Sequence, residues 1–155
     1  MVEIGSYQGE SMEIFVQSGC VDTIVCIDPW KNGYDESDIA SSSDMAKAES
    51  MFDKRADNAR KTTKVIKHKG TIDTFLQSEE FKQIEGKVDL VYIDACHSYD
   101  ACKHDIEMCK KFIKPNVAFS GHDYVGQWSG VIEAIDETLG KPDWVFSEYS
   151  WIKFV

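Results

Sequence analysis

Residues 143–155, DWVFSEYSWIKFV, contain two apolar segments with almost nothing between them. The segments Asp143–Glu148 and Trp151–Val155 are rich in aromatic and β-branched residues, which is typical of β-strands. A parallel pair of strands would need a crossover connection of about a dozen residues. The two segments are therefore expected to form an antiparallel hairpin that turns near Tyr149 and Ser150.

The preceding chain alternates between short apolar runs and segments with helical periodicity, which indicates βαβ units and a parallel sheet. The expected strands are Val2–Ile4, Thr23–Ile27, Lys64–His68, Val88–Ile93 and Val117–Ser120. Apolar residues recur at intervals of three and four between them. The expected helices are marked by Met12, Phe15 and Val16; by Met45, Ala48, Phe52, Ala56 and Ala59; by Phe75 and Leu76; by Cys102, Ile106, Cys109 and Ile113; and by Val131, Ile135 and Leu139. We expect Pro115 to end the fourth helix and Gly140 to end the fifth.

Five βα units followed by a hairpin predict a Rossmann-like, doubly wound α/β fold, with a mostly parallel seven-stranded sheet that ends in an antiparallel hairpin. This order of elements excludes a simple flavodoxin-like sheet. No repeat or domain boundary interrupts the pattern, so residues 1–155 are expected to form one domain. The polar segment Gly33–Asp44 is long enough to be a lid or a binding loop, and a surface insertion is the alternative.

Composition narrows the class of protein. The formal net charge of −10 argues against a nucleic-acid partner. No apolar run approaches the roughly 20 residues of a membrane-spanning helix, and no signal peptide precedes Val2–Ile4. The five cysteines include no CxxC pair, so they indicate neither a disulfide framework nor a zinc knuckle. We therefore expect a cytoplasmic protein without a membrane partner.

A loop with two glycines follows the first expected strand, within Glu3–Glu10. A dinucleotide-binding fingerprint needs glycines at relative positions one, three and six. The first position is Gly5, but Tyr7 and Glu10 occupy the other two. Tyr7 would block a pyrophosphate, and Glu10 would repel it at the start of the helix. These features, with the carboxylate of Glu3 nearby, favour S-adenosylmethionine over NAD, because S-adenosylmethionine carries a sulfonium and an ammonium but no phosphate.

Further candidate cofactor contacts follow the second and third expected strands. Asp28 lies 19 residues after Gly9 (28 − 9), where an acidic residue can accept hydrogen bonds from ribose hydroxyls; alternatively it only begins a turn. We expect Trp30 or the Gly70-Thr71 turn to contact the adenine or its ribose, and a core aromatic is the alternative for Trp30. The expected cofactor-binding residues are Glu3, Gly5, Ser6, Gly9, Asp28, Trp30, Gly70, Thr71 and Asp94.

Two polar clusters follow the fourth and fifth expected strands. Asp94 ends the fourth strand, His97 lies three residues later, and His122-Asp123 follows the fifth. Ligands bind beyond the carboxyl ends of the strands in an open parallel sheet. Asp94, His122 and Asp123 are therefore candidate ligands of one divalent cation, which leaves His97 as a candidate general base. The alternative is that Asp94 and Ser98 cap the next helix and that the histidines are merely exposed.

Four motifs carry a resemblance to a known family: VEIGSYQGES at 2–11, IDPW at 27–30, YIDACHSYD at 92–100 and SGHDY at 120–124. Together they resemble the macrocin O-methyltransferase-like and cephalosporin-hydroxylase-like subfamily of class I S-adenosylmethionine-dependent methyltransferases, over essentially the whole chain. The resemblance implies that Asp94 and the pair His122-Asp123 hold magnesium and that His97 is the base. His122 replaces an acidic ligand of the family, so manganese, iron or zinc also suits the site.

The resemblance implies O-methylation of a small hydroxylated acceptor from S-adenosylmethionine, with Asp94 and His97 catalytic and a divalent cation assisting. A metal-independent O- or N-methyltransferase, in which His97 or Tyr99 acts alone, is one alternative. A non-catalytic cofactor-binding or interaction module is another. Relatives usually carry a segment before the first strand that helps enclose the substrate, and this chain is expected to lack it because it begins on that strand. The acceptor and the oligomeric state, including a homo-oligomer, stay open.

Overall fold

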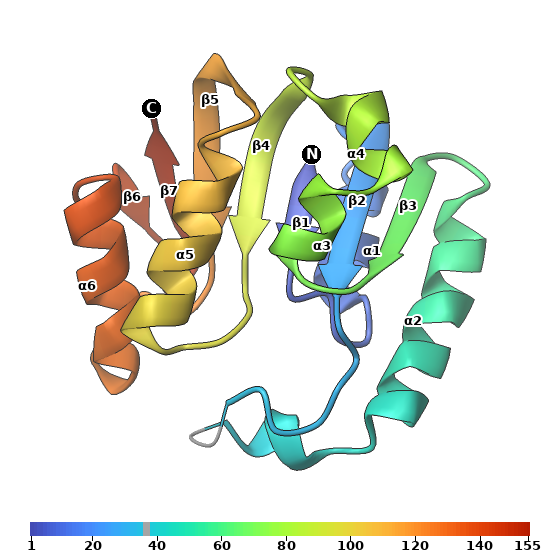
Figure 1. Cartoon of the computed structure of the whole chain (residues 1–155), viewed down its shortest axis with the longest axis horizontal. Helices are drawn as coiled ribbons and strands as arrows, with labels where there is room; N and C mark the ends of the chain where they lie inside the picture. The colour runs from blue at the N-terminus through green and yellow to red at the C-terminus, as the bar shows by residue number, and fades with distance from the viewer. Residues whose placement is uncertain (36–37) are drawn as a thin grey trace.

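The structure is a computed structural model that describes residues 1–35 and 38–155. Its centre is a seven-stranded sheet in the order β3-β2-β1-β4-β5-β7-β6 (Figure 1). The strands are β1 (Val2–Ile4), β2 (Thr23–Asp28), β3 (Lys64–Lys69), β4 (Val88–Ile93), β5 (Ile113–Gly121), β6 (Trp144–Val145) and β7 (Trp151–Phe154). β1 to β5 pair in parallel, and β7 runs antiparallel to both β5 and β6. The predicted fold class is confirmed.

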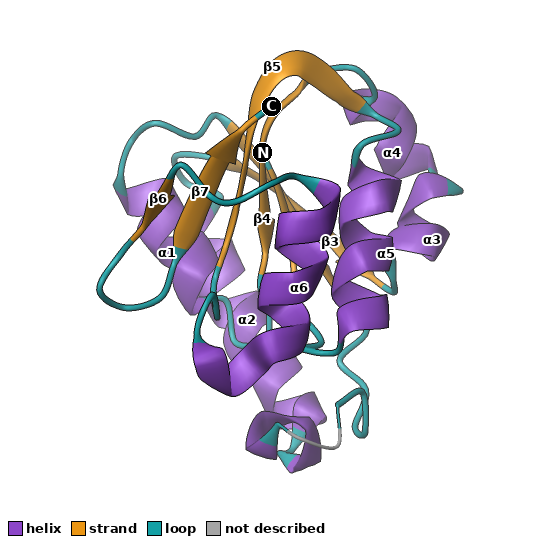
Figure 2. Ribbon diagram, turned by 90° about the vertical axis from the view of Figure 1, so that its left-hand side faces the viewer, coloured by secondary structure: helices purple, strands orange, loops and turns teal. Residues whose placement is uncertain are grey.

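Helices cover both faces of the sheet. They are α1 (Glu10–Gln17), α2 (Met45–Ala59), α3 (Ile72–Leu76), α4 (Glu79–Ile84), α5 (Tyr99–Cys109) and α6 (Ser129–Thr138), with short 3₁₀ turns at Ile39–Ser42 and Gly126–Trp128. Buried residues of α1 and α2 share one apolar cluster, and those of α3 to α6 share the other. Figure 2 shows the sheet near its edge, with α5 and α6 on one side and α1 on the other. None of the helices in the described chain is long and apolar enough to cross a membrane.

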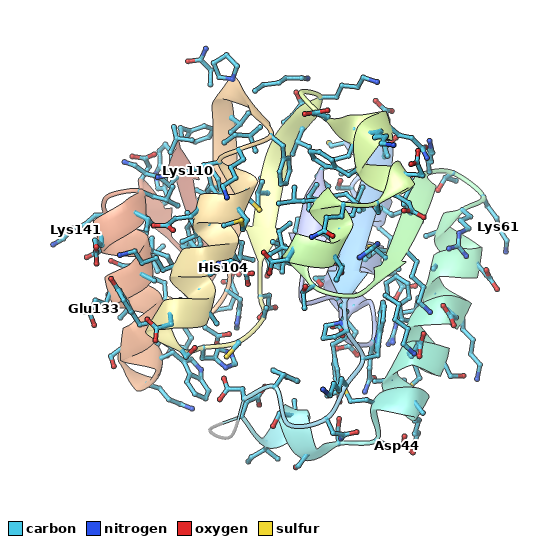
Figure 3. The ribbon with its side chains drawn as sticks, viewed as in Figure 1. Asp44, Lys61, His104, Lys110, Glu133 and Lys141 are labelled. Atoms are coloured by element: carbon cyan, nitrogen blue, oxygen red, sulfur yellow. The ribbon has the colours of Figure 1, made fainter. Side chains whose placement is uncertain are left out.

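Local sequence signals set the helix starts. Asp44, labelled at the beginning of α2 in Figure 3, accepts a hydrogen bond from the backbone N–H of Lys47 at 3.0 Å. Thr71 and Ser78 cap α3 and α4 in the same way. Such side chains satisfy backbone donors that have no partner inside the helix. Residues 36 and 37 of the Gly33–Asp44 loop, for which the sequence suggests a lid, lie outside the described residues.

The assignment of Ile113 to the fourth expected helix is wrong. α5 ends at Cys109, and Ile113 is the first residue of β5. Pro115 therefore lies inside a strand rather than ending a helix, beside a shift in register between β4 and β5. Proline lacks an N–H donor and is tolerated in sheets at such irregularities. Asn116, with a φ of 61°, makes the irregular turn of the backbone there.

Two smaller differences concern short elements. The sequence indicates one short helix after β3, whereas the chain forms both α3 and α4. β6 is also shorter than the expected Asp143–Glu148, because the chain turns at once: the N–H of Phe146 donates to the carbonyl of Ser150 at 2.8 Å. The predicted hairpin is confirmed, with β7 as its inner strand.

The loop after β1 passes close to the end of β4 at Gly5. The N–H of Gly5 donates to the carbonyl of Ile27 and that of Asp94 to Ile4, both at 2.9 Å. Gly5 has a φ of 87°, and a Cβ atom at this position would lie 1.9 Å from the carbonyl oxygen of Asp94. No side chain fits between these two backbone segments, so glycine is required here for packing as well as for conformation.

We therefore expect Gly5→Ala to lower the free energy of unfolding by more than about 4 kcal/mol, as for other severe backbone clashes. Gly86→Ala is the matched control, because Gly86 also has a positive φ (67°) but meets no atom within 4 Å. It should cost only the conformational strain of about 1–2 kcal/mol. Urea unfolding of both variants measures the difference, and equal losses would contradict the packing constraint.

Candidate active site

Two adjoining cavities open at the carboxyl ends of the parallel strands, where ligands bind in sheets of this kind. The first, of about 210 Å³, is lined by the ends of β1, β2 and β3, by the start of α3 and by α5. The second, of about 330 Å³, lies between the glycine loop and the residues that follow β4 and β5. Gly5, Tyr7 and Asp94 line both cavities, so the two form one cleft.

Glu3 supports the glycine loop from inside the protein. Its side chain is fully buried, and its two carboxylate oxygens accept hydrogen bonds from the hydroxyls of Ser6 and Ser11, each at 2.6 Å. Burial raises the pKa of Glu3 to about 7, although the serine hydrogen bonds act against the rise. Ser6 lines the second cavity, whereas Glu3 and Gly9 line neither of the two. Direct contact of Glu3 or Gly9 with a cofactor stays a prediction.

Asp28 lines the first cavity at the end of β2. Its carboxylate accepts hydrogen bonds from the backbone N–H groups of Tyr7 at 2.8 Å and Trp30 at 2.6 Å. The bond from Trp30 closes the turn after β2, and this turn is the alternative role that the sequence gives to Asp28. Asp28 thus connects the glycine loop to the turn after β2 and still faces the cavity. Burial raises the pKa of Asp28, with the two backbone hydrogen bonds opposing the rise.

The two candidate adenine contacts, Trp30 and the Gly70-Thr71 turn, have different environments in the structure. Trp30 is 5% exposed and packs on Phe52 with ring centroids 5.0 Å apart, and its indole N–H donates to the carbonyl of Tyr7 at 2.7 Å. It lines neither of the two cavities, which corresponds to the core-aromatic alternative. Gly70 and Thr71 do line the first cavity, beside the start of α3.

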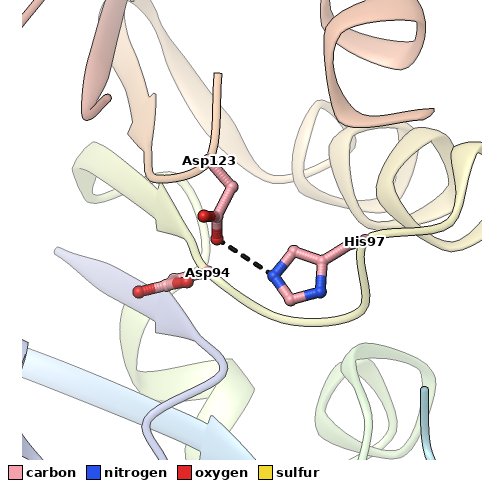
Figure 4. A group of neighbouring side chains, drawn as sticks. All are labelled: Asp94, His97 and Asp123. Atoms are coloured by element: carbon pink, nitrogen blue, oxygen red, sulfur yellow. Dashed lines mark hydrogen bonds and ion pairs between the residues drawn. The ribbon is translucent and has the colours of Figure 1, made fainter. Parts of the chain in front are cut away.

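Three side chains from the ends of β4 and β5 meet in the cleft (Figure 4). One ligand atom each from Asp94, His97 and Asp123 lie within 4.8 Å of one another. The Nε2 atom of His97 is 3.0 Å from Oδ2 of Asp123. The histidine grouped with the two aspartates is thus His97, whereas a ligand role for His122, which the sequence proposes, stays a prediction. His122 instead lies beside the group, with Nδ1 3.1 Å from Oδ1 of Asp123.

Two further residues hold His97, and the sequence does not reveal either. Oδ2 of Asp35 accepts from the backbone N–H of His97 at 2.9 Å and lies 3.0 Å from its Nδ1. The ring of Trp128 stacks on the imidazole, with centroids 4.0 Å apart and planes 15° apart. Asp35 lies in a polar loop whose residues show no helical or strand periodicity. Its position in the candidate lid segment Gly33–Asp44 is the one sequence signal that could have identified it. Carboxylate oxygens thus lie at both ring nitrogens, an arrangement that favours the positive imidazolium, which donates from Nδ1 to Asp35 and from Nε2 to Asp123.

The charges in this group influence one another. Burial, followed by the charge of Asp123, raises the pKa of Asp94 to about 6. Burial alone would raise the pKa of Asp123, but its hydrogen bond with His97 and the nearby His122 hold it below the usual value. Burial would lower the pKa of His97, yet the bonds and charges of Asp123 and Asp35 raise it. Shifted pKa values grouped in a cleft are typical of functional sites.

The comparisons with known proteins agree with this geometry. A family model described as "Methyltransferase domain" matches residues 2–124, which is most of the chain. The protein belongs to the class I methyltransferases. The resemblance seen in the sequence is confirmed at the level of this family. No curated protein matches the chain.

Solved methyltransferase structures share the fold at low sequence identity. The calicheamicin methyltransferase CalS11 is 14% identical with a TM-score of 0.71, and the match covers 99% of this chain and 71% of CalS11. TomG from Streptomyces achromogenes, an O-methyltransferase involved in tomaymycin synthesis and solved with S-adenosylmethionine, is 14% identical with a TM-score of 0.63, over 99% and 72%. The Bacillus cereus O-methyltransferase in complex with S-adenosylhomocysteine is 16% identical with a TM-score of 0.62, over 99% and 72%.

The raised pKa of Glu3 predicts a pH-dependent stability. Because the folded-state value of about 7 lies above the usual 4.5, the folded methyltransferase binds this proton more tightly than the unfolded chain does. Its stability should therefore fall as the pH rises from 4.5 to 7. Glu3→Gln cannot lose the proton, so relative to the parent it should gain roughly 2–3 kcal/mol between pH 5 and pH 8.

Urea unfolding at the two pH values measures this gain. Glu133→Gln is the control, because Glu133 is exposed on α6 and points away from the fold (Figure 3). Its unfolding free energy should follow that of the parent at both pH values. Parallel pH profiles for Glu3→Gln and the parent would contradict the burial of a titrating carboxyl under the glycine loop.

Proposed function

We propose that this methyltransferase transfers a methyl group from S-adenosylmethionine to the hydroxyl oxygen of a small acceptor. The observation that carries the proposal is the single cleft. Asp28 and the turn after β3 line its first cavity, His97 and Asp123 line its second, and Gly5 with Asp94 lines both. A cofactor and an acceptor could thus meet near Asp94. The structural neighbours TomG and the Bacillus cereus enzyme, both named as O-methyltransferases, support the choice of an oxygen acceptor.

The residues of the first cavity fit S-adenosylmethionine better than a dinucleotide. Tyr7 lines both cavities where a pyrophosphate would need an open backbone, and Glu10 and Glu13 bring negative charge to the first turn of α1. Asp28 faces the cavity with a carboxylate that can accept from ribose hydroxyls. When bound, S-adenosylmethionine supplies an electrophilic methyl group on a positively charged sulfur, and the acidic surroundings suit that charge.

His97 is the proposed base. Asp35 holds Nδ1 and Trp128 holds the plane of the ring, so Nε2 has a defined orientation beside Asp123 at the wall of the second cavity. A base positioned in this way takes the hydroxyl proton of the acceptor as the oxygen becomes a nucleophile. The remaining contribution of the protein is orientation, because the two cavities keep the acceptor and the nucleoside on fixed sides of Asp94.

A divalent cation held by Asp94 and Asp123 is part of the proposal. Ligand atoms of Asp94, Asp123 and His97 lie within 4.8 Å of one another. The two carboxylates suit magnesium or manganese, and iron or zinc would also take the imidazole as a third ligand. Such an ion would act as a Lewis acid toward the acceptor hydroxyl. One observation favours the metal-independent alternative instead: His97 already contacts Asp123 directly, at 3.0 Å, and its positive form can balance that carboxylate.

Ligand binding tests the cofactor. Calorimetric titration should detect binding of S-adenosylhomocysteine and of S-adenosylmethionine, and it should give no binding signal with NAD. Asp28→Ala should weaken the binding of S-adenosylhomocysteine by about 1–3 kcal/mol, roughly 5- to 150-fold in Kd, because the ribose hydroxyls lose hydrogen bonds to a charged group. Asp22→Ala is the control, since the exposed Asp22 precedes the same strand at its opposite end. Tighter binding of NAD than of S-adenosylmethionine would exclude this cofactor assignment.

Metal binding is tested separately with Mn²⁺, by titration calorimetry and by activity before and after chelation. Asp123→Asn should reduce both Mn²⁺ affinity and turnover, because it removes a ligand charge. His97→Ala should reduce turnover and leave Mn²⁺ affinity nearly unchanged if the histidine is the base; a parallel loss of affinity would make it a ligand. Full activity in chelated enzyme would contradict the metal and favour the metal-independent alternative.

A further inference from the structure

The C-terminal hairpin carries an apolar surface that the proposed function does not use. Nine large apolar side chains are exposed in the described part of the chain, and six of them lie within residues 144–155. The four aromatic ones are each 50–59% exposed. Apolar side chains gathered in this way at a protein surface are typical of an interaction site. These six residues form the hairpin patch: Trp144, Val145, Phe146, Tyr149, Phe154 and Val155.

The register of the hairpin brings two of the aromatic side chains together. Trp144 pairs with Ile152 across β6 and β7. Because side chains alternate between the two faces of a strand, Phe154 lies on the same face as Ile152 and therefore on the same face as Trp144. The rings of Trp144 and Phe154 meet edge to face, with centroids 6.1 Å apart and planes at 89°. This contact still leaves more than half of each residue exposed to water.

β6 forms one edge of the sheet, and its side chains do not protect that edge (Figure 1). Natural sheets protect an edge strand with charged side chains, above all lysine, because an open edge can pair with another chain. The opposite edge, β3, contains Lys64, Lys67 and Lys69. The two residues of β6, Trp144 and Val145, are both apolar and exposed. The β6 edge therefore has the features of a pairing surface.

The charge of the hairpin suits a second copy of this chain. The whole chain carries a formal net charge of −10, so two copies repel each other when their acidic surfaces meet. Residues 141–155 carry no such excess, because their two lysines and two acidic residues balance. Lys153 and Asp143 also pair within one molecule at 3.0 Å, so burial of the patch would leave neither of them without a counter-ion. Two copies can thus meet here without repulsion.

The size of the hairpin patch agrees with such a contact. A fully buried aromatic side chain removes about 150–250 Å² from water, so the four half-exposed aromatic residues still offer roughly 300–500 Å². A stable interface buries about 800 Å² on each partner, and the two valines and the backbone of β6 add to the aromatic area. Two antiparallel copies of one strand are related by a twofold axis, so the same patch serves both partners.

We propose that two copies of this chain associate through the hairpin patch, with β6 of one copy antiparallel to β6 of the other. The two sheets then continue as one across the twofold axis, and the aromatic side chains of the two patches bury one another. Association stops at two copies, because the contact uses the same surface on both and lysines protect the β3 edges. The inference is independent of the methyl-transfer proposal, since no residue of the patch lines the cleft.

Sedimentation velocity at micromolar concentrations tests the association. The parent protein should sediment as a dimer of about 35 kDa (2 × 17.6). Trp144→Lys and Val145→Lys each give β6 a charge of the kind that β3 carries. Each should weaken the association by at least about 30-fold in Kd, as expected for a residue at the centre of an interface. Ile39→Lys is the matched control, because it makes the same change at a residue that is 90% exposed outside the patch, and it should leave the dimer unchanged.

Hydrogen exchange of the parent protein adds a test that needs no variant. Backbone N–H groups on the outer edge of β6 should exchange slowly where the dimer forms and quickly after dilution, because pairing protects them from water. A dimer that both lysine variants leave intact, or exchange at β6 that dilution does not change, would overturn this inference. A parent protein that stays monomeric would also overturn it and would leave the patch to a different protein. Assemblies that grow beyond two copies would contradict the closed twofold contact.

Discussion

The close approach of Gly5 to the backbone of Asp94 is the constraint on which the site depends. β1 lies in the middle of the sheet and pairs with both β2 and β4, so the loop that follows it must pass between two strand ends. Only a residue without a Cβ atom can do so, because such an atom would lie 1.9 Å from the Asp94 carbonyl. This contact places the glycine loop against the group of Asp94, His97 and Asp123 and joins the two cavities into one cleft.

Several acidic groups lie in the cleft or directly beneath it, and burial determines their pKa values. Glu3, Asp94 and Asp105 all have pKa values raised to between about 6 and about 7, with burial as the largest cause. Carboxyl groups kept partly neutral near physiological pH avoid the repulsion that several charges would otherwise cause. The same groups respond to a positively charged ligand or to a cation, because either one stabilises their ionised form. An acidic site of this kind suits a sulfonium cofactor better than a phosphate-bearing one.

His97 shows how a side chain acquires a defined role from distant parts of the chain. Asp35 comes from the loop after β2, Asp123 from the end of β5 and Trp128 from the turn before α6, yet all three contact the same imidazole. Each contact fixes a different property of the ring: the direction of Nδ1, the direction of Nε2 and the orientation of the ring plane. A ring held on three sides needs little reorganisation when a ligand binds, which supports the proposed role of His97 as a base.

The sequence by itself determined the order of elements, the hairpin and the two strand ends that carry Asp94 and Asp123, because the periodicity of apolar residues and the carboxyl-edge rule are local properties of the chain. It misassigned Ile113, since a helical spacing continued by chance into β5. Only the tertiary structure decided that His97 rather than His122 joins the two aspartates, that Trp30 packs in the core, that Asp35 holds His97, and that Asp105 lines the cleft. These four facts depend on contacts between residues far apart in the chain, such as the 62 positions from Asp35 to His97. Spacing within one segment carries no information about such contacts.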